Sequence, residues 1–198
     1  QFNIANKNQT YWFDAKINYM NLLLTIKESD IEDNEMKPNN GYRERFASRG
    51  VLLDKNNKVY LLNVSKHGYH KLPGGGIDEG EDKETAFYRE FLEEVGCNAE
   101  IITEIGEIVE YRNYDNVGLK QTSYCYLARQ KGPQQQSSLE QGELDEGMFE
   151  VKTKDIDEAI KLLENDKPDN TEGKFIQKRD LHILKTAKKN IILLTPKA

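Results

Sequence analysis

The 198-residue sequence lacks the features that mark several classes of protein. It contains two cysteines, Cys97 and Cys125, which are too few and too far apart for a disulfide framework or a zinc knuckle. No apolar run approaches the roughly 20 residues that a membrane-spanning helix needs. The segment from Gln1 to Lys16 is polar and has no apolar centre, unlike a secretory signal. These absences predict a cytoplasmic protein that does not span a membrane, with both cysteines reduced and buried.

An excess of basic residues is also missing. Lys and Arg number 28 against 34 Asp and Glu, which gives a formal net charge of −6. Binding to nucleic-acid phosphates needs clustered Lys and Arg, and binding to single strands adds interleaved aromatic residues. No such basic stripe is visible in the sequence, so the composition disfavours nucleic acid as a partner.

The length fits one globular domain with an added arm. We interpret residues 41–198 as a single domain and residues 1–40 as an N-terminal arm that includes the first strand. Because an apolar segment begins at Met20, we expect residues 1–19 to be an appendage. Strands before and after a central helix predict an α/β (α+β) protein with a mixed β-sheet between helical layers.

Alternating and apolar patterns place the other elements of this sheet. The predicted strands are Leu22–Ile26, Arg45–Leu53, Lys58–Val64, Ile101–Tyr111, Lys120–Arg129 and Met148–Val151, and the predicted helices are Ile156–Glu164 and about Lys178–Lys189. Residues 132–141 and 142–147 read as loops. We expect the lysines near the end of the last helix to complement its negative C-terminus; these are Lys185, Lys188 and Lys189.

The most informative segment is residues 75–97, GGIDEGEDKETAFYREFLEEVGC. Asp82 can cap a helix that Gly96 ends. On this helix three carboxylates share one face, those of Glu90, Glu93 and Glu94. The opposite face is predicted to pack into the core and consists of Phe87, Tyr88, Phe91 and Val95.

A cluster of carboxylates repels itself unless a cation neutralises it. Since no His or Cys is nearby, the oxygen donors favour Mg²⁺ or Mn²⁺ over zinc. The backbone at Gly74 and Gly75 carries no side chains and can approach a metal or a phosphate closely. We expect Arg89 to orient the acids by pairing with Glu81 rather than to contact substrate.

The same segment resembles the Nudix box, G-x5-E-x7-R-E-U-x-E-E-x-G-U, in which U is a bulky apolar residue. Every fixed position matches: Gly75, Glu81, Arg89, Glu90, Glu93, Glu94 and Gly96. Phe91 and Cys97 fill the apolar positions, Cys97 being smaller than is typical. The resemblance extends over roughly residues 43–190 and implies an αβα sandwich with a mixed sheet.

The resemblance also implies an activity, the Mg²⁺- or Mn²⁺-dependent hydrolysis of the pyrophosphate bond in a nucleoside diphosphate linked to another moiety. By similarity, Glu90 and Glu94 are metal ligands, Glu93 is a third, and a backbone carbonyl of Gly74 or Gly75 completes the set. The expected catalytic residues of the box are these three glutamates together with Glu81 and Arg89.

The general base is left open by the sequence. A box carboxylate or an acid of the loop 142–147 would deprotonate the attacking water, and the acids of that loop are Glu143, Asp145 and Glu146. We take Glu146 as the candidate from this loop, against the alternative of a solvated turn. Substrate contacts are predicted at His70, Tyr69 and Arg49, each of which has an ordinary strand-end interpretation as well.

The substrate itself is open between oxidised nucleoside triphosphates, ADP-ribose, dinucleoside polyphosphates and nucleotide sugars, with damaged-base triphosphates marginally favoured. Two other functions remain, a catalytically silent nucleotide-binding regulator and an RNA decapping enzyme. All box acids are present, which disfavours the first, and the acidic charge balance disfavours the second. Nudix proteins are often dimers, so the resemblance also suggests that this protein forms a homodimer.

Overall fold

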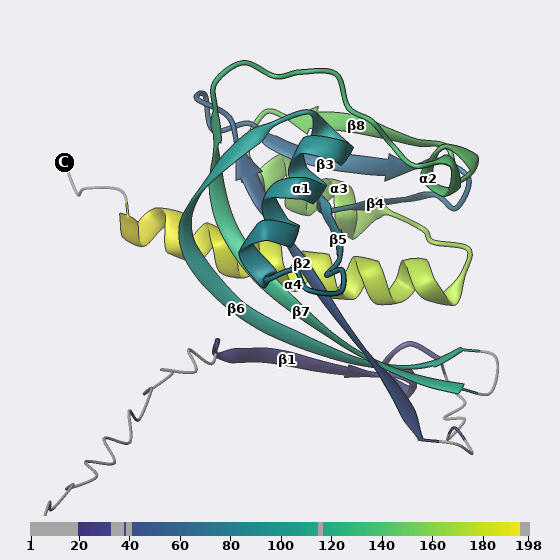
Figure 1. Ribbon diagram of the computed structural model, residues 1–198. Coiled ribbons are helices and arrows are strands. Elements are labelled where there is room, and N and C mark those ends of the chain that lie inside the picture. Colours follow the sequence, from purple (N-terminus) through teal and green to yellow (C-terminus); the bar gives the residue numbers. More distant parts are fainter. Residues whose placement is uncertain (1–19, 33–37, 39–40, 115–116, 195–198) are drawn as a thin grey trace, which may run out of the picture.

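The computed structural model describes residues 20–32, 38, 41–114 and 117–194 (Figure 1). The predicted appendage, residues 1–19, lies outside the described residues. In chain order the elements are β1 (Leu22–Lys27), a 3₁₀ helix η1 (Glu28–Asp30), β2 (Tyr42–Leu53), β3 (Val59–Val64), β4 (Tyr69–Lys71), β5 (Gly74–Gly76), α1 (Lys83–Val95), β6 (Asn98–Tyr114), β7 (Val117–Lys131), α2 (Gln141–Asp145), β8 (Met148–Thr153), α3 (Ile156–Asn165) and α4 (Thr171–Leu194).

The strands form one mixed sheet. The order is β1-β6-β7-β2-β3-β4, with β5 paired to β2 and β8 paired to β3. The pairs β1–β6 and β2–β7 are parallel, whereas β6–β7 is a long antiparallel hairpin. The first predicted strand therefore belongs to this sheet, because β1 runs beside β6 over residues 22–27.

The two faces of the sheet bury different hydrophobic clusters, because side chains alternate along a strand. On β2, Val51 and Leu53 join the cluster under α3 and α4, while Leu52 joins the cluster under α1. On β3, Leu61 and Leu62 divide in the same way. Helices thus cover both faces (Figure 1), and the predicted αβα sandwich is confirmed.

Helix α1 begins and ends where the sequence predicts. The Asp82 carboxylate accepts hydrogen bonds from the backbone N–H groups of Glu84 and Thr85, at 3.1 and 2.7 Å. Gly96 adopts the left-handed conformation with φ of 62°. Phe87, Phe91 and Val95 are buried, but the prediction for Tyr88 is wrong. Tyr88 is 42% exposed, and its ring meets that of Phe87 edge to face.

The last helix differs from its prediction. Helix α4 spans 24 residues, so Lys185, Lys188 and Lys189 do not lie in its last turn. Lys185 pairs instead with Glu164 and Lys188 with Asp157, both on the neighbouring α3. The expected complement to the helix dipole is therefore wrong for these lysines, and two of them connect α4 to α3. None of the described helices is long and apolar enough to cross a membrane.

Candidate active site

The box carboxylates project from α1 toward the glycine strand β5. Glu94 is 2% exposed, and its Oε2 accepts a hydrogen bond of 2.6 Å from the backbone N–H of Gly74. Glu90 lies against Gly75, where a Cβ atom would stand 2.4 Å from Oε1 of Glu90. Glu93 is more exposed, with 40% of its side chain accessible. The carboxylates of Glu90 and Glu94 thus meet the glycine backbone of β5.

Arg89 holds this acidic face together. Its guanidinium donates to both carboxylate oxygens of Glu81 at 3.0 Å, to Glu90 at 2.8 Å and to Glu93 at 3.0 Å. It also donates to the carbonyl of Gly76 at 2.9 Å. The predicted pairing of Arg89 with Glu81 is confirmed. Arg89 therefore balances part of the negative charge of three acids, those of Glu81, Glu90 and Glu93.

Lys71 supplies a second cation to the acidic face. Its Nζ lies 2.8 Å from Oε1 of Glu94. Burial nevertheless raises the pKa of Glu94 to about 7, against the opposing effects of Lys71 and the Gly74 N–H. Burial also raises the pKa of Glu90, although Arg89 opposes it. Both carboxylates therefore lie in a partly desolvated environment, which raises the pKa of each above its ordinary value.

The acidic face fits a hard divalent cation in its chemistry but is not a finished cage. All donors are oxygens, and the absent side chain of Gly75 leaves the backbone open beside Glu90. Among the described residues no group of three or more His, Cys, Asp or Glu is already arranged to hold a metal. The reason is visible in the contacts, since Arg89 turns Glu90 and Glu93 toward itself and Lys71 holds Glu94.

The acidic face lines a cavity of about 370 Å³ together with a basic wall of arginines. Four arginines form that wall. They come from two strands and one helix that are distant in the sequence: Arg45 and Arg49 on β2, Arg112 on β6 and Arg179 on α4. Carboxylates and guanidinium groups that line one cavity suit a ligand that binds a cation and also carries negative charge of its own.

Arg49 is the one predicted substrate contact that reaches this cavity. Its side chain is 4% exposed, and its Nε donates to Ser123 Oγ at 3.2 Å. Burial lowers the pKa of Arg49 to about 10, assisted by the nearby charge of Arg179. Arg49 therefore stays charged at neutral pH in a largely desolvated position.

The other two predicted substrate contacts lie outside the lining of the cavity. His70 is engaged by Asp166 at 2.9 Å through Nδ1 and by Asn63 at 2.7 Å through Nε2. Tyr69 is 5% exposed and packs against Gly173, where a Cβ would meet its ring at 2.7 Å. Both side chains tie β4 to the C-terminal elements rather than face the box.

The acids after the second hairpin also differ from their prediction. Residues 141–145 form the short helix α2 rather than a loop. Glu146 follows this helix and pairs with Lys66 and His67, at 3.4 and 3.0 Å, away from the cavity lining. Glu143 and Glu140 line the cavity instead.

Sequence reasoning missed Lys71, Arg112, Arg179 and Gln121 as cavity residues. A signal was present in the strands. On β7, the side chain of Gln121 leaves the same face of the strand as those of Cys125 and Leu127, which are buried under α4. A polar residue on the core-facing side of a strand indicates that a polar site adjoins the hydrophobic core there.

With this geometry in place, the comparison with known families is decisive. The model of the NUDIX domain matches residues 44–175. The chain belongs to the Nudix family. Its sequence is 56% identical over 45 residues to an RNA pyrophosphohydrolase of Sulfurovum sp. (strain NBC37-1), covering 23% of this chain and 27% of that protein. It is 39% identical over 64 residues to the RNA pyrophosphohydrolase of Pelagibacter ubique (strain HTCC1062), covering 31% of this chain and 40% of that one.

A further relative is an RNA pyrophosphohydrolase of Wolbachia pipientis subsp. Culex pipiens (strain wPip), 32% identical over 87 residues, or 43% of this chain and 51% of the relative. The Nudix chain thus spans about a quarter to a half of these curated relatives. In structure it resembles a NUDIX hydrolase from Nitrosomonas europaea, with a TM-score of 0.53, 13% identity, and coverage of 78% of this chain and 98% of the other. The E. coli ORF135 protein gives a TM-score of 0.51 at 13% identity, covering 79% and 96%. These two likenesses support the fold.

Proposed function

We propose that this Nudix protein hydrolyses the pyrophosphate bond of a nucleoside diphosphate linked to another moiety. The observation that carries the proposal is the contact of two box glutamates, Glu94 buried and Glu90 partly buried, with a side-chain-free backbone. Glu94 accepts from the Gly74 N–H, and Glu90 fills the space beside Gly75. An anhydride between two phosphates presents several oxygens of the kind that a carboxylate-bound cation can share with the protein.

In this proposal Glu90 and Glu94 hold Mg²⁺ or Mn²⁺, Glu93 is a third ligand, and a carbonyl of Gly74 or Gly75 completes the set. When bound, the cation neutralises phosphate oxygens and makes water a better nucleophile. Arg89 acts through the glutamates, since its donors are directed at Glu81, Glu90, Glu93 and Gly76. Phosphoryl transfer needs such positioning more than it needs a protein nucleophile.

For the general base we propose Glu143 in place of Glu146. Glu143 lines the cavity from α2. Lys66 and His67 pair with Glu146, which lies outside the cavity lining. One carboxylate oxygen of Glu143, Oε2, accepts a hydrogen bond of 2.9 Å from the Glu140 N–H at the start of α2, and the carboxylate can accept the proton of the attacking water through its other oxygen. The box carboxylates remain the alternative base.

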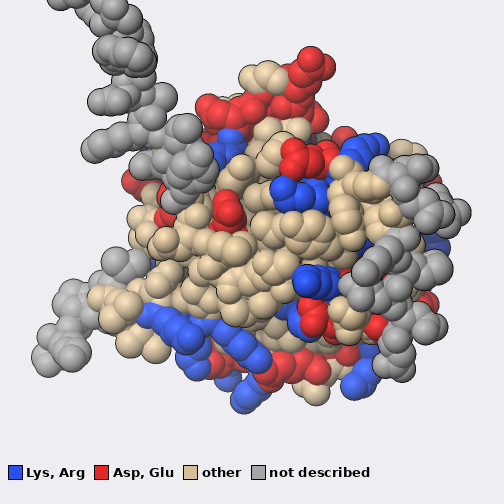
Figure 2. All heavy atoms as spheres, turned by 90° about the horizontal axis from the view of Figure 1, so that it is seen from below, with Lys and Arg blue, Asp and Glu red and all other residues tan. Residues whose placement is uncertain are grey.

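A second candidate substrate is the 5′-triphosphate end of an RNA. The relatives in the comparison are named RNA pyrophosphohydrolases, which reopens a partner that composition disfavours. On the face seen in Figure 2, acidic and basic side chains lie next to one another around a central area that carries few charges. That face offers RNA no field of a single sign, so contact with RNA would be centred on the terminal phosphates.

A substrate panel tests the proposal. Nucleoside triphosphates, ADP-ribose, a nucleotide sugar, a dinucleoside polyphosphate and a 5′-triphosphorylated RNA are each incubated with Mg²⁺, and the products are separated by chromatography. Cleavage between phosphates in any of them, lost in Glu94→Gln, supports the proposal. Binding without turnover across the panel would instead support the catalytically silent regulator.

A further inference from the structure

The basic wall of the cavity occupies positions that would otherwise belong to the hydrophobic core. On β2, Val51 and Leu53 are buried under α3 and α4. Arg49 and Arg45 precede them in the same alternation, so their side chains leave the same face of the sheet. The register places Arg45 beside Gln121 of β7, and Arg45 Nη1 donates to Gln121 Oε1 at 2.7 Å. The core surface thus continues into the cavity as a polar surface.

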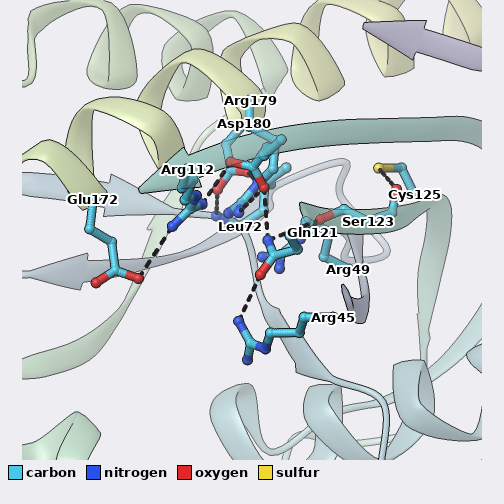
Figure 3. A network of polar contacts seen from close by, with 11 residues as sticks. Arg45, Arg49, Leu72, Arg112, Gln121, Ser123, Cys125, Glu172, Arg179 and Asp180 are labelled. Atoms are coloured by element: carbon cyan, nitrogen blue, oxygen red, sulfur yellow. Dashed lines mark hydrogen bonds and ion pairs between the residues drawn. The ribbon is translucent and has the colours of Figure 1, made fainter. Parts of the chain in front are cut away.

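Arg112 and Arg179 of this wall lie close together (Figure 3), and both contact one buried carboxylate. Glu110 is fully buried and accepts from Arg112 at 2.7 Å, while Arg179 Nη1 lies 3.4 Å from it. Arg179 Nε also donates to Asp180 at 2.7 Å. Burial by itself would raise the pKa of Glu110, but the charges of Arg179 and Arg112 hold it below the ordinary value.

The positive charge of the wall exceeds the buried negative charge. Four guanidinium groups line it, and the buried carboxylates that reach it are those of Glu110 and Asp180. Glu172 contacts Arg112 at 3.5 Å from an exposed position, with 46% of its side chain accessible. Because an exposed carboxylate is hydrated and easily displaced, an anionic ligand can take its place.

Two donors in the wall have no hydrogen-bond partner among the described residues. They are Nη2 of Arg179 and Nε of Arg112, both buried. Arg179 is 2% exposed and Arg112 5%. A buried guanidinium donor without an acceptor is costly, so its persistence in a cavity wall indicates a ligand that supplies the acceptor.

We propose that Arg49, Arg112 and Arg179, with Arg45 beside them, form a subsite for a phosphate group beyond the bond that is cleaved. The inference rests on the proposed function, because it assumes that the box glutamates hold the scissile anhydride. Guanidinium groups bind phosphate through paired hydrogen bonds, which suits the free donors of this wall. The cavity, about 370 Å³, is within the usual range for a small-molecule site.

The subsite selects a class of substrate. In this proposal a chain of three or more phosphates would bring negative charge both to the cation at the acidic face and to the arginines. A nucleoside diphosphate sugar presents an uncharged sugar where the arginines stand, and leaves their donors unpaired. The structure therefore favours triphosphate or longer substrates, free or at the end of a nucleic acid, over nucleotide sugars.

Binding of inorganic tripolyphosphate tests the subsite without chemistry. Calorimetry is done on the full chain with a chelator present, for wild type, Arg49→Gln and Arg179→Gln. Each variant should bind about 10- to 100-fold more weakly, the effect of losing one charge-assisted contact. Arg49→Lys keeps the charge and should recover part of the affinity.

The control is Arg129→Gln at the other end of β7, where the side chain contacts Asp54 and Asn57 outside the cavity. This control should bind tripolyphosphate like the wild type. Arg179→Gln also breaks a buried ion-pair network and can fail to fold. Arg49→Gln removes a single hydrogen bond to Ser123 and keeps the test decisive.

Kinetics separate the subsite from the proposed function. The ratio of kcat/KM for a nucleoside triphosphate to that for a nucleotide sugar should fall about 10-fold or more in Arg49→Gln. Equal losses on both substrates, or unchanged tripolyphosphate binding in both glutamine variants, overturn the subsite while leaving the activity in place. Arginine-dependent binding in a wild type that hydrolyses nothing would support the subsite and overturn the proposed function.

Discussion

Glu90 and Gly75 are in contact so close that no side chain fits between them. A Cβ on Gly75 would stand 2.4 Å from Oε1 and 2.6 Å from both Cδ and Oε2 of Glu90. These distances are far below ordinary contact, so any larger residue must move the carboxylate. The glycine and the glutamate therefore act as one unit, which explains why the box needs both in a fixed register.

Gly75→Ala is expected to lower activity about 100-fold, because displacing a positioned group by about 1 Å has effects of this size. Steady-state kinetics with Mg²⁺ measure the effect. Gly142→Ala is a matched control near the cavity, since no atom lies within 4 Å of a Cβ at that position. A Gly75→Ala protein as active as Gly142→Ala would show that Glu90 needs no fixed position.

Substitutions of Glu81 and Glu90 are expected to impair the protein in different ways. Glu81 contacts Arg89 and the Asp78 backbone, so Glu81→Gln should misplace Arg89 and still bind metal. Glu90→Gln removes a proposed ligand and should reduce kcat about 10³-fold or more. Metal titration by calorimetry alongside kinetics distinguishes the two. Similar metal affinities and similarly small rate losses would contradict this division of roles.

The box was predictable because its geometry is local. Asp82, Gly96 and the shared face of Glu90 and Glu94 follow from helical spacing within one segment. Tyr88 was placed wrongly because it lies at the border of the buried face, where spacing alone does not decide exposure. Helical periodicity therefore predicts which residues lie at the centre of the buried face but not which residues at its border are exposed.

The basic wall was not predictable in the same way. Arg45, Arg112 and Arg179 are far apart in sequence and meet through the pairing of β2, β7 and β6 and the packing of α4. No local pattern states which strands become neighbours. For the same reason the sequence does not show that Glu143, and not Glu146, lines the cavity.

The helix that carries the glutamates is held by aromatic packing. Phe87 is fully buried, with its ring 4.0 Å from that of Phe91 and 5.1 Å from that of Tyr126. Phe87→Ala should lower the free energy of unfolding by about 3–5 kcal/mol, measured by urea denaturation. Phe149→Ala, at a residue 51% exposed, should change it by less than about 1 kcal/mol. Equal effects would mean that α1 is not anchored through this cluster.

Because of Glu110, the free energy of unfolding should decrease as the pH is lowered into the acid range. Its pKa is held below the ordinary value near 4.5, so its ionised form stabilises the fold above that pH. This contribution is lost as the pH falls through the lowered pKa of the folded state. Glu110→Gln should unfold about 3 kcal/mol more easily at pH 7, because Arg112 and Arg179 lose a buried partner.

Urea denaturation from pH 7 to pH 3 measures this effect. The difference between wild type and Glu110→Gln should shrink as the pH falls below about 4.5. Glu100→Gln, at an exposed position of the same strand, serves as the control and should match wild type throughout. A difference between wild type and Glu110→Gln that is independent of pH would contradict an ionised Glu110.

The central claim is that the box glutamates cleave a bond between phosphates. The most direct measurement is chromatography of the products formed from a nucleoside triphosphate with Mg²⁺, by wild type and by Glu94→Gln. The account predicts a nucleoside monophosphate and pyrophosphate from the wild type and almost none from the variant. Release from phosphate monoesters alone, or equal product from both proteins, would contradict it.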